Sequence, residues 1–564
     1  MITAPPGAGG AGVDTLPGVT PLDELRDAIA SAATSLRADG TLDGPIDATL
    51  ERPKRVEFGD YSTNAAMLLA PKLGAPPRDI AARLGAELGE RLGDGLAKVD
   101  VAGPGFLNIF LSDAWYRDAL SHVLDAGDAF GGGGAAHSPE RVLIEFVSAN
   151  PTGPLTAAGG RHAAYGDALA RMLTFAGNEV QREYYINDHG SQVAKLGASI
   201  RARARGEDVP QGSYEGEYVR DLAAEIEGSA DADPDALAQD GVALIVEGIR
   251  ETLHRFRVDF DTWFSERTLH EGDDGGAIAR AYAALEQRGS TFVSDDAVWL
   301  RTTTHGDDKD RVLRRSNGED TYFASDIAYH LDKRARGFDR LIDVWGADHH
   351  GYVPRMKAAF AALGDDPDDL ELLIMQFVNI IERGERSSMS KRRGDFITLA
   401  DLIDQIGVDA ARFFMLQRSH DTTVDLDLDL AREQSGENPV YYVQYAHARI
   451  VSVLDKADPG RLAAATLRPP LPPPGMDPAE RALIRKLLAF SGEVDDAVAR
   501  RAPHRIAVYA LELAQEFTAF YRDCQIVGAQ PAETESFRLG LSVASRRTIA
   551  RALDLLGVDA PDAM

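Results

Sequence analysis

Cysteine is almost absent from this sequence. Cys524 is the only one among 564 residues, which excludes an internal disulfide framework and any metal centre built from several cysteines. No stretch approaches 18 consecutive uncharged apolar residues, and the opening MITAPPGAGGAGVDTLPG has neither the basic start nor the apolar core of an export signal. We therefore expect a cytoplasmic protein without a membrane partner.

Basic residues are scarce relative to acidic ones. Lys and Arg total 60 against 89 Asp and Glu, which gives a formal net charge of −29. Nonspecific binding to nucleic acid requires Lys and Arg at the phosphates, so this balance excludes indiscriminate binding but allows an RNA partner at local basic patches. The hydrophobic content of 44% and charged content of 26% are typical of soluble proteins, and the length predicts two to four domains.

The first part of the chain predicts three segments. Residues 1–20 are rich in Gly, Pro and Ala with few bulky side chains, and we expect a disordered tail. Its GAGGAG matches a dinucleotide-binding glycine pattern, but no strand precedes it, so we attribute it to composition. Helical periodicity alternating with short β-like runs predicts a small α+β domain over 21–125, and the glycine-rich 126–138 predicts a linker.

The remaining chain predicts a Rossmann-type domain followed by helices. RVLIEFV (141–147) is apolar and β-branched like a buried parallel strand, and RLIDVWGADHH (340–350) repeats this pattern with polar residues at its end. The predicted fold class is multidomain α/β. We expect a parallel-sheet catalytic domain over 139–405 with an insertion at about 192–300, a connecting helical segment over 406–435 and an all-α C-terminal bundle over 436–564.

A loop with few side chains follows the first of these strands. In NPTGPLTAAGGRH (150–162), a Pro/Gly turn leads into a helix whose first backbone amides would face a phosphate. Gly159 and Gly160 would let a ribose or an adenine ring lie against the backbone. A tight strand-to-helix turn without a ligand fits the same residues, so the loop alone does not decide.

A basic loop, SSMSKRRGDF (387–396), lies far along the chain. Lys391, Arg392 and Arg393, flanked by Ser and Gly, suit a flexible clamp on a polyphosphate whose charge grows as it departs. By itself the segment is more typical of an exposed basic cluster. Taken together, the two loops predict a nucleotidyl-transfer site.

Several longer motifs carry a family resemblance. They are GDYSTNAAMLLA (59–70), EFVSANPTGPL (145–155), EYYINDHGSQV (183–193), TYFASDIAYHLDK (321–333), VWGADHHGYVPRM (344–356), NPVYYVQYAHARI (438–450) and LDLLGVDAPDAM (553–564). In this order they resemble the class I aminoacyl-tRNA synthetases, and the arginyl-tRNA synthetase family in particular. The two loops coincide with the two signature motifs of that class.

Both signatures depart from the family pattern. The first normally reads His-Ile/Val-Gly-His, whereas this chain has Thr-Ala-Ala-Gly at 156–159. His162, near one helical turn after Gly159, is the candidate replacement, and a plain helix-surface histidine is the alternative. The second signature has Ser388 at its first Lys position and keeps its second as Lys391. Because such transfer reactions rely on distributed electrostatics, we expect catalysis to survive these losses.

The resemblance implies three groups of site residues. The residues of the ATP site and of the chemistry would be Pro151, Gly153, Thr156, Gly159, Gly160, His162, Gly346, Asp348, His349, His350, Met389, Ser390 and Lys391. The residues of the arginine pocket would be Glu145, Ser148, Asn150, Tyr322, Asp326 and His349. The contacts with tRNA would be Phe106 and Asn108 near the N-terminus and Tyr441, Tyr442, Tyr445 and Met564 toward the C-terminus.

The chemistry of arginine agrees with this pocket. A buried guanidinium needs carboxylates or hydroxyls, and Tyr322 and Asp326 are four residues apart, so they share one face of a helix. Each residue also has an ordinary structural interpretation, such as a helix cap for Asp326, a core position for Phe106 and buried helix packing for the tyrosines. A zinc site at His349 and His350 is the rival interpretation, but no Cys or spaced third ligand is near, so we expect no metal ligands.

The resemblance implies a ligase that uses ATP with Mg²⁺ to join L-arginine to tRNA(Arg) through an arginyl-adenylate, and we expect a monomer. Family members commonly need bound tRNA for the first step. One alternative is a catalytically silent relative that binds tRNA or another RNA; another is an adenylyl-transferring enzyme acting on a small molecule only. The retained Glu145, Tyr322, Asp326 and Lys391 favour the ligase, because a binding module has no use for an arginine pocket. The tRNA-type end segments disfavour the small-molecule enzyme.

Overall fold

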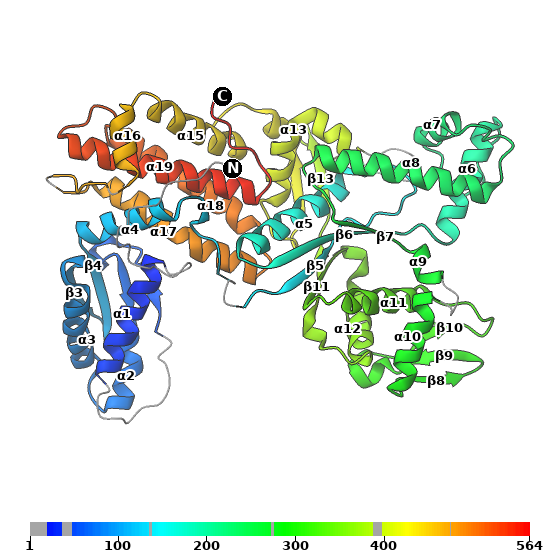
Figure 1. Cartoon of the computed structure of the whole chain (residues 1–564), viewed down its shortest axis with the longest axis horizontal. Helices are drawn as coiled ribbons and strands as arrows, with labels where there is room; N and C mark the ends of the chain where they lie inside the picture. Colours follow the sequence, from blue (N-terminus) through cyan, green and yellow to red (C-terminus); the bar gives the residue numbers. More distant parts are fainter. Residues whose placement is uncertain are drawn as a thin grey trace, which may run out of the picture. The chain divides into compact units, whose positions relative to one another are not determined.

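The computed structural model describes residues 20–36, 48–134, 138–271, 276–386, 397–467, 469–473 and 475–564 (Figure 1). The predicted tail, apart from Thr20, and the basic loop at 387–396 lie outside these residues. The chain divides into two compact units, which we describe separately. The first comprises Met1–Gly134, Arg449–Gly492 and Gln515–Thr548, and the second comprises Ala135–Ala448, Glu493–Ala514 and Ile549–Met564.

The N-terminal part of the first unit is a small antiparallel sheet with helices, as predicted. Its strand order is β1 (Leu50–Glu51), β2 (Tyr61–Thr63), β4 (Phe106–Leu111) and β3 (Leu96–Ala102), and its helices are α1 (Pro21–Ser35), α2 (Ala65–Leu73), α3 (Pro77–Leu92) and α4 (Asp113–Ala126). In β4, Leu107, Ile109 and Leu111 are fully buried. Strand alternation therefore places Phe106 and Asn108 on the face opposite this core.

The second unit is built on a parallel sheet, as the two apolar runs predict. Within the described chain the sheet consists of β12 (Leu370–Met375), β11 (Arg340–Gly346), β5 (Arg141–Glu145), β6 (Glu179–Ile186) and β7 (Thr262–Ser265), in that order. The chain leaves β5 through α5 (Ala157–Phe175) toward β6, whereas β11 lies on the other side of β5. In open parallel sheets, ligands bind at the carboxyl ends of the strands where the order reverses in this way.

The predicted insertion at about 192–300 needs a correction, because β7 interrupts it and belongs to the catalytic sheet. Before β7 come α6 (Ser191–Ala204), α7 (Glu217–Glu225) and α8 (Pro234–Arg255); after it come α9 (Arg267–His270), α10 (Gly276–Gln287) and a sheet of β8 (Thr291–Ser294), β9 (Ala297–Leu300) and β10 (Arg311–Arg314). β7 is four residues long, too short for its pattern to reveal a strand. Its position comes from its parallel pairing with β6.

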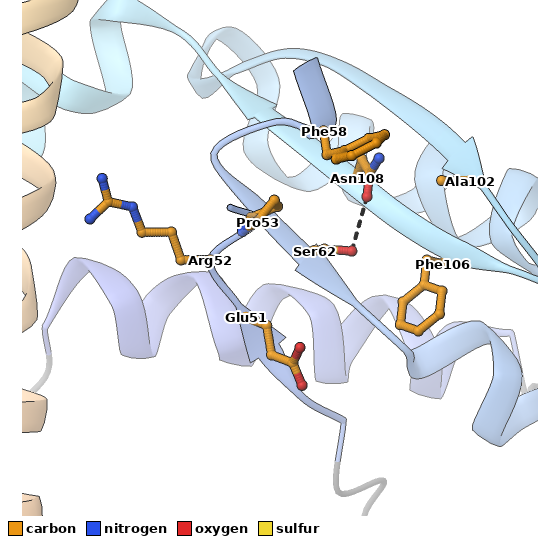
Figure 2. Close-up of a pocket in the computed structure, with 8 residues that line it drawn as sticks. All are labelled: Glu51, Arg52, Pro53, Phe58, Ser62, Ala102, Phe106 and Asn108. Carbon is orange, nitrogen blue, oxygen red and sulfur yellow. Dashed lines mark hydrogen bonds between the residues drawn. The ribbon is translucent and has the colours of Figure 1, made fainter. Parts of the chain in front are cut away.

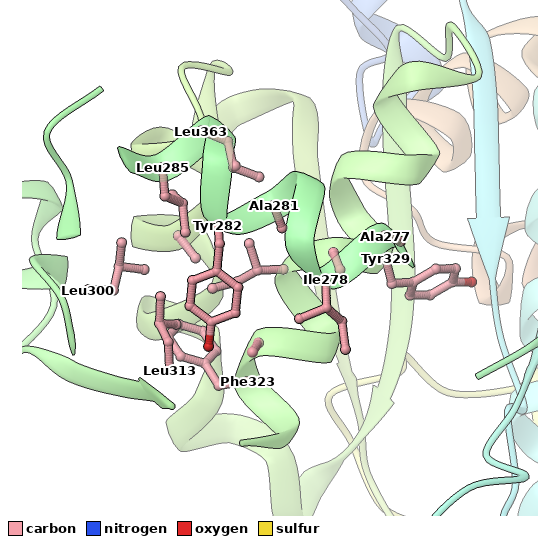
Figure 3. Packing of buried hydrophobic residues seen from close by; sticks show 14 of the residues in the cluster. Ala277, Ile278, Ala281, Tyr282, Leu285, Leu300, Leu313, Phe323, Tyr329 and Leu363 are labelled. Atoms are coloured by element: carbon pink, nitrogen blue, oxygen red, sulfur yellow. The ribbon is translucent and has the colours of Figure 1, made fainter. Parts of the chain in front are cut away.

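An apolar cluster holds helix α11 (Tyr322–Ala335) in place. Figure 3 shows Ala277, Ile278, Ala281, Tyr282 and Leu285 of α10 packed with Phe323 and Tyr329 of α11, together with Leu300, Leu313 and Leu363. Buried Phe323, Ala324 and Ile327 recur with the helical period. The face that carries Tyr322 and Asp326 therefore turns away from the cluster and toward the carboxyl ends of the catalytic strands.

A second small sheet follows the catalytic strands. It consists of β13 (Val378–Glu382), β14 (Glu385–Arg386) and β15 (Val424–Asp427), and it is accompanied by α12 (Val353–Ala362), α13 (Leu399–Leu416) and α14 (Leu428–Arg432). The segment 406–435, predicted to be helical, thus contains the strand β15, which pairs in parallel with β13. The four residues of β15 are again too few to give a readable alternation.

The C-terminal part is helical, as predicted. Its helices are α15 (Pro439–Leu454), α16 (Pro459–Ala465), α17 (Pro478–Ala499), α18 (His504–Asp523) and α19 (Ala532–Leu555). The two compact units share these helices, so the domain boundaries drawn from the sequence stay predictions. Across the described ranges, no helix is both long enough and apolar enough to cross a membrane.

A buried arginine joins distant segments of the second unit. Arg412 of α13 is fully buried, and its Nη2 lies 2.6 Å from Oδ2 of Asp167 in α5. Its Nη1 donates to the carbonyl of Phe256 at the end of α8, and its Nε donates to the carbonyl of Leu556 after α19, both at 2.9 Å. Arg412 thereby fixes α5, the end of α8 and the segment after α19 against one another.

Candidate functional site

Helix α5 begins where the sequence predicts, with Thr156 as its N-cap. The Thr156 hydroxyl accepts a hydrogen bond from the amide of Gly159 at 3.4 Å, and the amide of Ala157 donates to the carbonyl of Ile397 at 3.0 Å. Two amides of the first turn are therefore already occupied within the protein. The expected backbone cradle for phosphate is smaller than a free helix start would provide.

The glycines of this loop also need a correction. A Cβ on Gly160 would lie 2.6 Å from Cδ1 of Leu399, so the bare Cα at this position makes room for α13 and not for a nucleotide. A Cβ on Gly153 would lie 3.1 Å from the ring of Tyr218, whose hydroxyl donates to the carbonyl of Thr152 at 2.7 Å. Pro151 is buried beside them. Protein packing therefore explains Gly153 and Gly160 without a ligand.

The residues directly after the basic loop meet the residues that precede α5, while the convergence of the two loops themselves stays a prediction. The residues that follow the basic loop pair with the residues that precede α5, because the amide of Leu399 donates to the carbonyl of Leu155 at 2.8 Å and Thr398 forms a bridge with Thr156. On the other flank of the loop, Arg161 of α5 donates to the carbonyl of Gln376, just before β13. The C-terminal flank of the basic loop is thus anchored at the start of α5, while the start of β13 is held by the second turn of α5. Met389, Ser390 and Lys391 themselves lie outside the described residues.

His162 faces the reversal point of the sheet and is not a plain surface residue. Burial lowers the pKa of His162 to about 4, while the nearby carbonyl of Val344 in β11 and the carboxylate of Asp348 oppose this shift. The imidazole is therefore neutral at pH 7. Its Nδ1 is buried and has no hydrogen-bond partner within the described chain. His162 thus lies beside β11 at the edge where a nucleotide would bind.

The polar residues that follow β11 are exposed at the same edge. Gly346 ends the strand, and Asp348, His349 and His350 lie in the short 3₁₀ helix η5 (Ala347–Tyr352). His349 Nε2 is 3.5 Å from Asp348 Oδ2, with both side chains more than half exposed. No group of three or more His, Cys, Asp and Glu side chains suited to a metal ion occurs in the part of the chain that the structure describes.

A cluster of carboxylates, which we call the carboxylate pocket, lies where β6, β7 and α11 meet. Asp326 of α11 accepts a hydrogen bond from the Tyr352 hydroxyl at 2.5 Å, and Glu266 follows β7 with only 2% of its surface exposed. Burial raises the pKa of Glu266 to about 7, and the charges of Asp326 and Asp188 raise it further. Burial also raises the pKa of Asp326. Within the described ranges no Lys or Arg side chain forms an ion pair with these three carboxylates.

Glu266 and Asp188 are the pocket residues that sequence reasoning missed. Each directly follows a strand of the catalytic sheet, and polar residues at the carboxyl ends of parallel strands are the usual ligand contacts. The signal is present in YYIND and WFSE, where acids end apolar runs, but it becomes readable only once β7 is known to belong to the sheet. Tyr352, which orients Asp326, is identified only by its contact.

Glu145, predicted to contact arginine, belongs to a different cluster in this structure. Its Oε2 accepts from Nζ of Lys333 at 2.6 Å, and its Oε1 accepts from the Ser148 hydroxyl at 2.9 Å. Lys333 is fully buried and also donates to Asp343 at 2.7 Å, while His330 Nε2 lies 2.9 Å from the same carboxylate. The charge of Glu145 is thus already balanced, and its contact with arginine stays a prediction.

The remaining predicted arginine contacts border the carboxylate pocket. Tyr322 is the first residue of α11 and is 60% exposed. Val147 and Ser148 adopt positive φ angles of 67° and 36°, which are rare for residues with a side chain, so the chain turns sharply as β5 ends. This turn brings Asn150 to an exposed position after the strand. We describe these placements without a bound substrate, so the roles of the residues stay predictions.

The N-terminal residues predicted to contact tRNA line a cavity in the first unit. Figure 2 shows Phe58 and Phe106 on either side of Asn108, with Glu51, Arg52 and Pro53 at the rim of a cavity of about 250 Å³. Asn108 is 5% exposed, and its Oδ1 accepts from the Ser62 hydroxyl at 2.9 Å. Phe106 is half-buried at the cavity, which argues against the simple core position considered for it.

The C-terminal residues predicted to contact tRNA lie on and near α15. The rings of Tyr441 and Tyr445 stack at 6.0 Å, and Tyr445 is 41% exposed, while Tyr442 is half-buried. The terminal segment lies against the same helix, since His447 Nδ1 is 2.9 Å from the carbonyl of Pro561. Met564 is 54% exposed. These residues are accessible, so buried helix packing does not account for Tyr445.

Three family models match successive parts of the chain. The arginyl tRNA synthetase N-terminal domain matches residues 23–111, the catalytic domain of tRNA synthetases class I (R) matches 121–454, and the DALR anticodon binding domain matches 443–564. The chain belongs to the arginyl-tRNA synthetase family. Membership in this family confirms the resemblance drawn from the motifs, including the class I catalytic domain and the helical anticodon-binding type of C-terminal domain.

Individual arginyl-tRNA synthetases agree over nearly full length. An arginine–tRNA ligase of Nitratidesulfovibrio vulgaris is 44% identical over 559 residues, covering 96% of this chain and 100% of that protein. A solved structure of a putative arginyl-tRNA synthetase from Campylobacter jejuni is 34% identical, with a TM-score of 0.73, and covers 80% of this chain and 100% of that one. Thermus thermophilus arginyl-tRNA synthetase, at 24% identity, shares the fold, with a TM-score of 0.74 over 96% of this chain and 99% of that one.

Proposed function

We propose that this arginyl-tRNA synthetase family member ligates L-arginine to tRNA(Arg) with ATP, through an arginyl-adenylate, and releases AMP and pyrophosphate. The observation that carries the proposal is the cluster of Asp326, Glu266 and Asp188, which lacks a Lys or Arg partner among the described residues and lies at the carboxyl ends of the catalytic strands. We further propose that the protein acts as a monomer in the cytoplasm.

The guanidinium of arginine supplies the charge that this pocket lacks. A guanidinium is planar and has five N–H donors, so two carboxylates can each receive it through paired hydrogen bonds. Asp326 is held by Tyr352 and Glu266 is nearly inaccessible, which suits them to grip the cation from two sides. Tyr322 covers the entrance, and Asn150 and Ser148 hold the backbone end of the substrate. Glu145 acts through Ser148 in this proposal, because Lys333 already binds its other oxygen.

In the first step, a carboxylate oxygen of arginine attacks the α-phosphorus of ATP. The bond between the α-phosphorus and its bridging oxygen breaks, and pyrophosphate leaves with the electron pair. His162, Asp348, His349 and the start of α5 at Thr156 contact the nucleotide, and Lys391 stabilises the departing pyrophosphate. Mg²⁺ would enter with ATP, and it would balance the charge of the phosphates.

In the second step, a hydroxyl of the terminal ribose of tRNA attacks the arginyl carbonyl and AMP leaves. The RNA contacts lie at sites that suit nucleobases. Phe106 offers a stacking surface at the N-terminal cavity, while Asn108 offers hydrogen bonds to a base edge, and the stacked Tyr441 and Tyr445 offer an aromatic surface near Met564. Tyr442 completes the predicted set on α15.

The proposal is tested by charging tRNA(Arg) with labelled arginine in the presence of ATP and Mg²⁺. We expect a base-labile arginyl ester on the tRNA, and we expect Lys391→Ala to reduce its formation. Citrulline, the neutral isostere of arginine, is the matched control, because its urea group leaves two buried carboxylates without a cation. Binding of tRNA without any charging would instead support the catalytically silent alternative, and charging with citrulline would contradict the pocket.

A further inference from the structure

Arg161, in the second turn of α5, is a buried cation with an unusual set of partners. It is 1% exposed. Its Nη1 donates to the carbonyls of Gln376 at 2.7 Å and Phe377 at 3.3 Å, and its Nη2 donates to those of Ser419 and Thr422, both at 2.8 Å. All of these partners are neutral backbone groups, and no carboxylate forms an ion pair with Arg161 within the described ranges.

The charge of Arg161 is therefore poorly balanced by the protein itself. Burial lowers the pKa of Arg161 to about 10, and the nearest opposing acid is Asp421, which is exposed to water. Arg412 shows the usual alternative in the same unit, because it is equally buried but pairs with Asp167 at 2.6 Å. Burying a cation without a counter-charge costs folding free energy. We therefore infer that the electrostatic field of Arg161 has a function.

The position of Arg161 identifies the anion that would balance it. It lies five residues after the N-cap Thr156, which corresponds to about 7.5 Å along the helix axis. The helix start itself carries partial positive charge and no charged side chain, and two of its first amides are occupied by protein groups. Arg161 is thus the full positive charge that α5 contributes near its own beginning, and it is held there by the residues around the starts of β13 and β15.

We propose that Arg161 is an electrostatic positioning residue for adenylation: its buried guanidinium stabilises the negative charge that develops on the departing pyrophosphate at the start of α5. The inference rests on the proposed function. Arg161 does not touch the phosphates; its hydrogen bonds hold it in place, and its field acts through low-dielectric protein. One charge about 8 Å away at an effective dielectric constant of about 20 corresponds to about 2 kcal/mol, or roughly 30-fold in rate.

The test compares Arg161→Met with Arg161→Lys in ATP–pyrophosphate exchange measured with cognate tRNA present. We expect Arg161→Met to lower kcat about 30-fold while the KM for arginine changes less than about twofold, because the arginine pocket is built from other elements. Arg161→Lys keeps the charge and loses most of the carbonyl contacts, so we expect it to retain kcat within about threefold. If Arg161→Met does not fold, Arg161→Gln replaces it as the neutral variant.

Arg412→Met is the matched control for loss of a buried arginine. Asp167 keeps its contacts with Arg171 and Arg182 in that variant, so we expect kcat of the folded protein within about threefold of the wild type. Equal losses of kcat in Arg161→Lys and in the neutral variant would overturn the charge effect. The role of Arg161 would then be limited to holding neighbouring segments together through its hydrogen bonds. Wild-type kcat in the neutral variant would also overturn it. Absence of exchange and charging by the wild type would instead refute the proposed function.

Discussion

Two groups of carboxylates lie beside the same catalytic strands, and they differ in whether a lysine balances their charge. In the first group, Glu145 and Asp343 share the ammonium of Lys333. Burial acts to raise the pKa of both acids. For Asp343, Lys333 and His330 outweigh burial and the pKa falls to about 2, whereas the pKa of Glu145 stays raised despite Lys333. In the second group, Asp326 and Glu266 are also buried but have no such cation in the described chain, and the pKa of Glu266 rises to about 7.

The comparison teaches that burial of acids does not by itself distinguish a substrate pocket from a structural cluster. The counter-charge distinguishes them, because a buried carboxylate without a cation is unstable as an ion and gains most from a ligand that brings one. The first group is complete without a ligand. In the proposed function, the guanidinium of arginine supplies the cation that the second group lacks.

The largest effect is expected from Lys333→Met. This variant leaves Glu145 and Asp343 buried without a cation, and no ligand replaces the lost charge. Removing one partner of a buried ion pair costs about 3–5 kcal/mol of unfolding free energy. Urea unfolding followed by hydrogen exchange in β5 and β11 measures this loss. Arg220→Met is the control, because it removes an exposed pair with Glu217 that is worth at most about 1 kcal/mol. Similar losses of unfolding free energy in Lys333→Met and Arg220→Met would contradict the role of Lys333 as the counter-charge of the first group.

A smaller but more specific effect is expected from Asp326→Asn in the second group. The variant loses a charged hydrogen-bond partner of arginine, worth about 1.5–3 kcal/mol, so the KM for arginine rises about 10- to 150-fold. Stability should not fall, since one of several repelling carboxylates is neutralised. Steady-state charging gives the KM, and Asp332→Asn on the same helix is the control. Unchanged use of arginine by Asp326→Asn would show that the pocket lies elsewhere.

The pH dependence of stability and of arginine binding tests the role of Glu266. The folded pKa of Glu266 is raised above its usual value of 4.5, so its contribution to stability is full below pH 4.5 and is lost as pH rises through about 7. The affinity for arginine should change in the opposite direction and rise with pH, because the ionised form of Glu266 attracts the guanidinium. We expect the KM for arginine to fall about tenfold between pH 6 and pH 8. In Glu266→Gln this dependence should disappear, and its persistence would assign it to another group.

The smallest effect is expected from Tyr352→Phe, which removes only the hydroxyl that orients Asp326. The loss of one hydrogen bond, about 1 kcal/mol, should raise the KM for arginine about fivefold and leave kcat nearly unchanged. Charging kinetics at saturating ATP measure both constants. Tyr214→Phe removes an exposed hydroxyl bonded to Gln192 and serves as the control. A fall in kcat alone would mean that Tyr352 serves the chemical step and not the pocket.

The sequence predicts those parts of the fold that depend on continuous local pattern. β5 and β11 are mostly apolar, because both faces of a parallel sheet are covered, and this pattern can be recognised in the sequence. β7 and β15 have four residues each, and their membership in a sheet depends on partners far away in the chain. Likewise, Thr156 is recognisable as a cap, whereas the occupation of the next amide by Ile397 is not.

The candidate site was predictable to a similar degree. Asp326 and Tyr322 stand four residues apart on one helix, so their shared face follows from the period alone. The neutralisation of Glu145 by Lys333 could not be foreseen, since 188 residues separate them. Gly160 predicts that another group lies close to the backbone, but the sequence does not show whether that group is a ligand or a side chain. In the structure it is the side chain of Leu399.

The contacts of Arg412 have a consequence for the order of assembly during synthesis. Arg412 reaches Asp167, made 245 residues earlier, and the carbonyl of Leu556, made 144 residues later. At about 5–20 residues per second, the ribosome needs roughly 7–30 s to deliver that last carbonyl. Until then the guanidinium has only Asp167 and the carbonyl of Phe256 as partners. The hydrogen bond from α13 to the segment after α19 is therefore the last of the three to become available during synthesis.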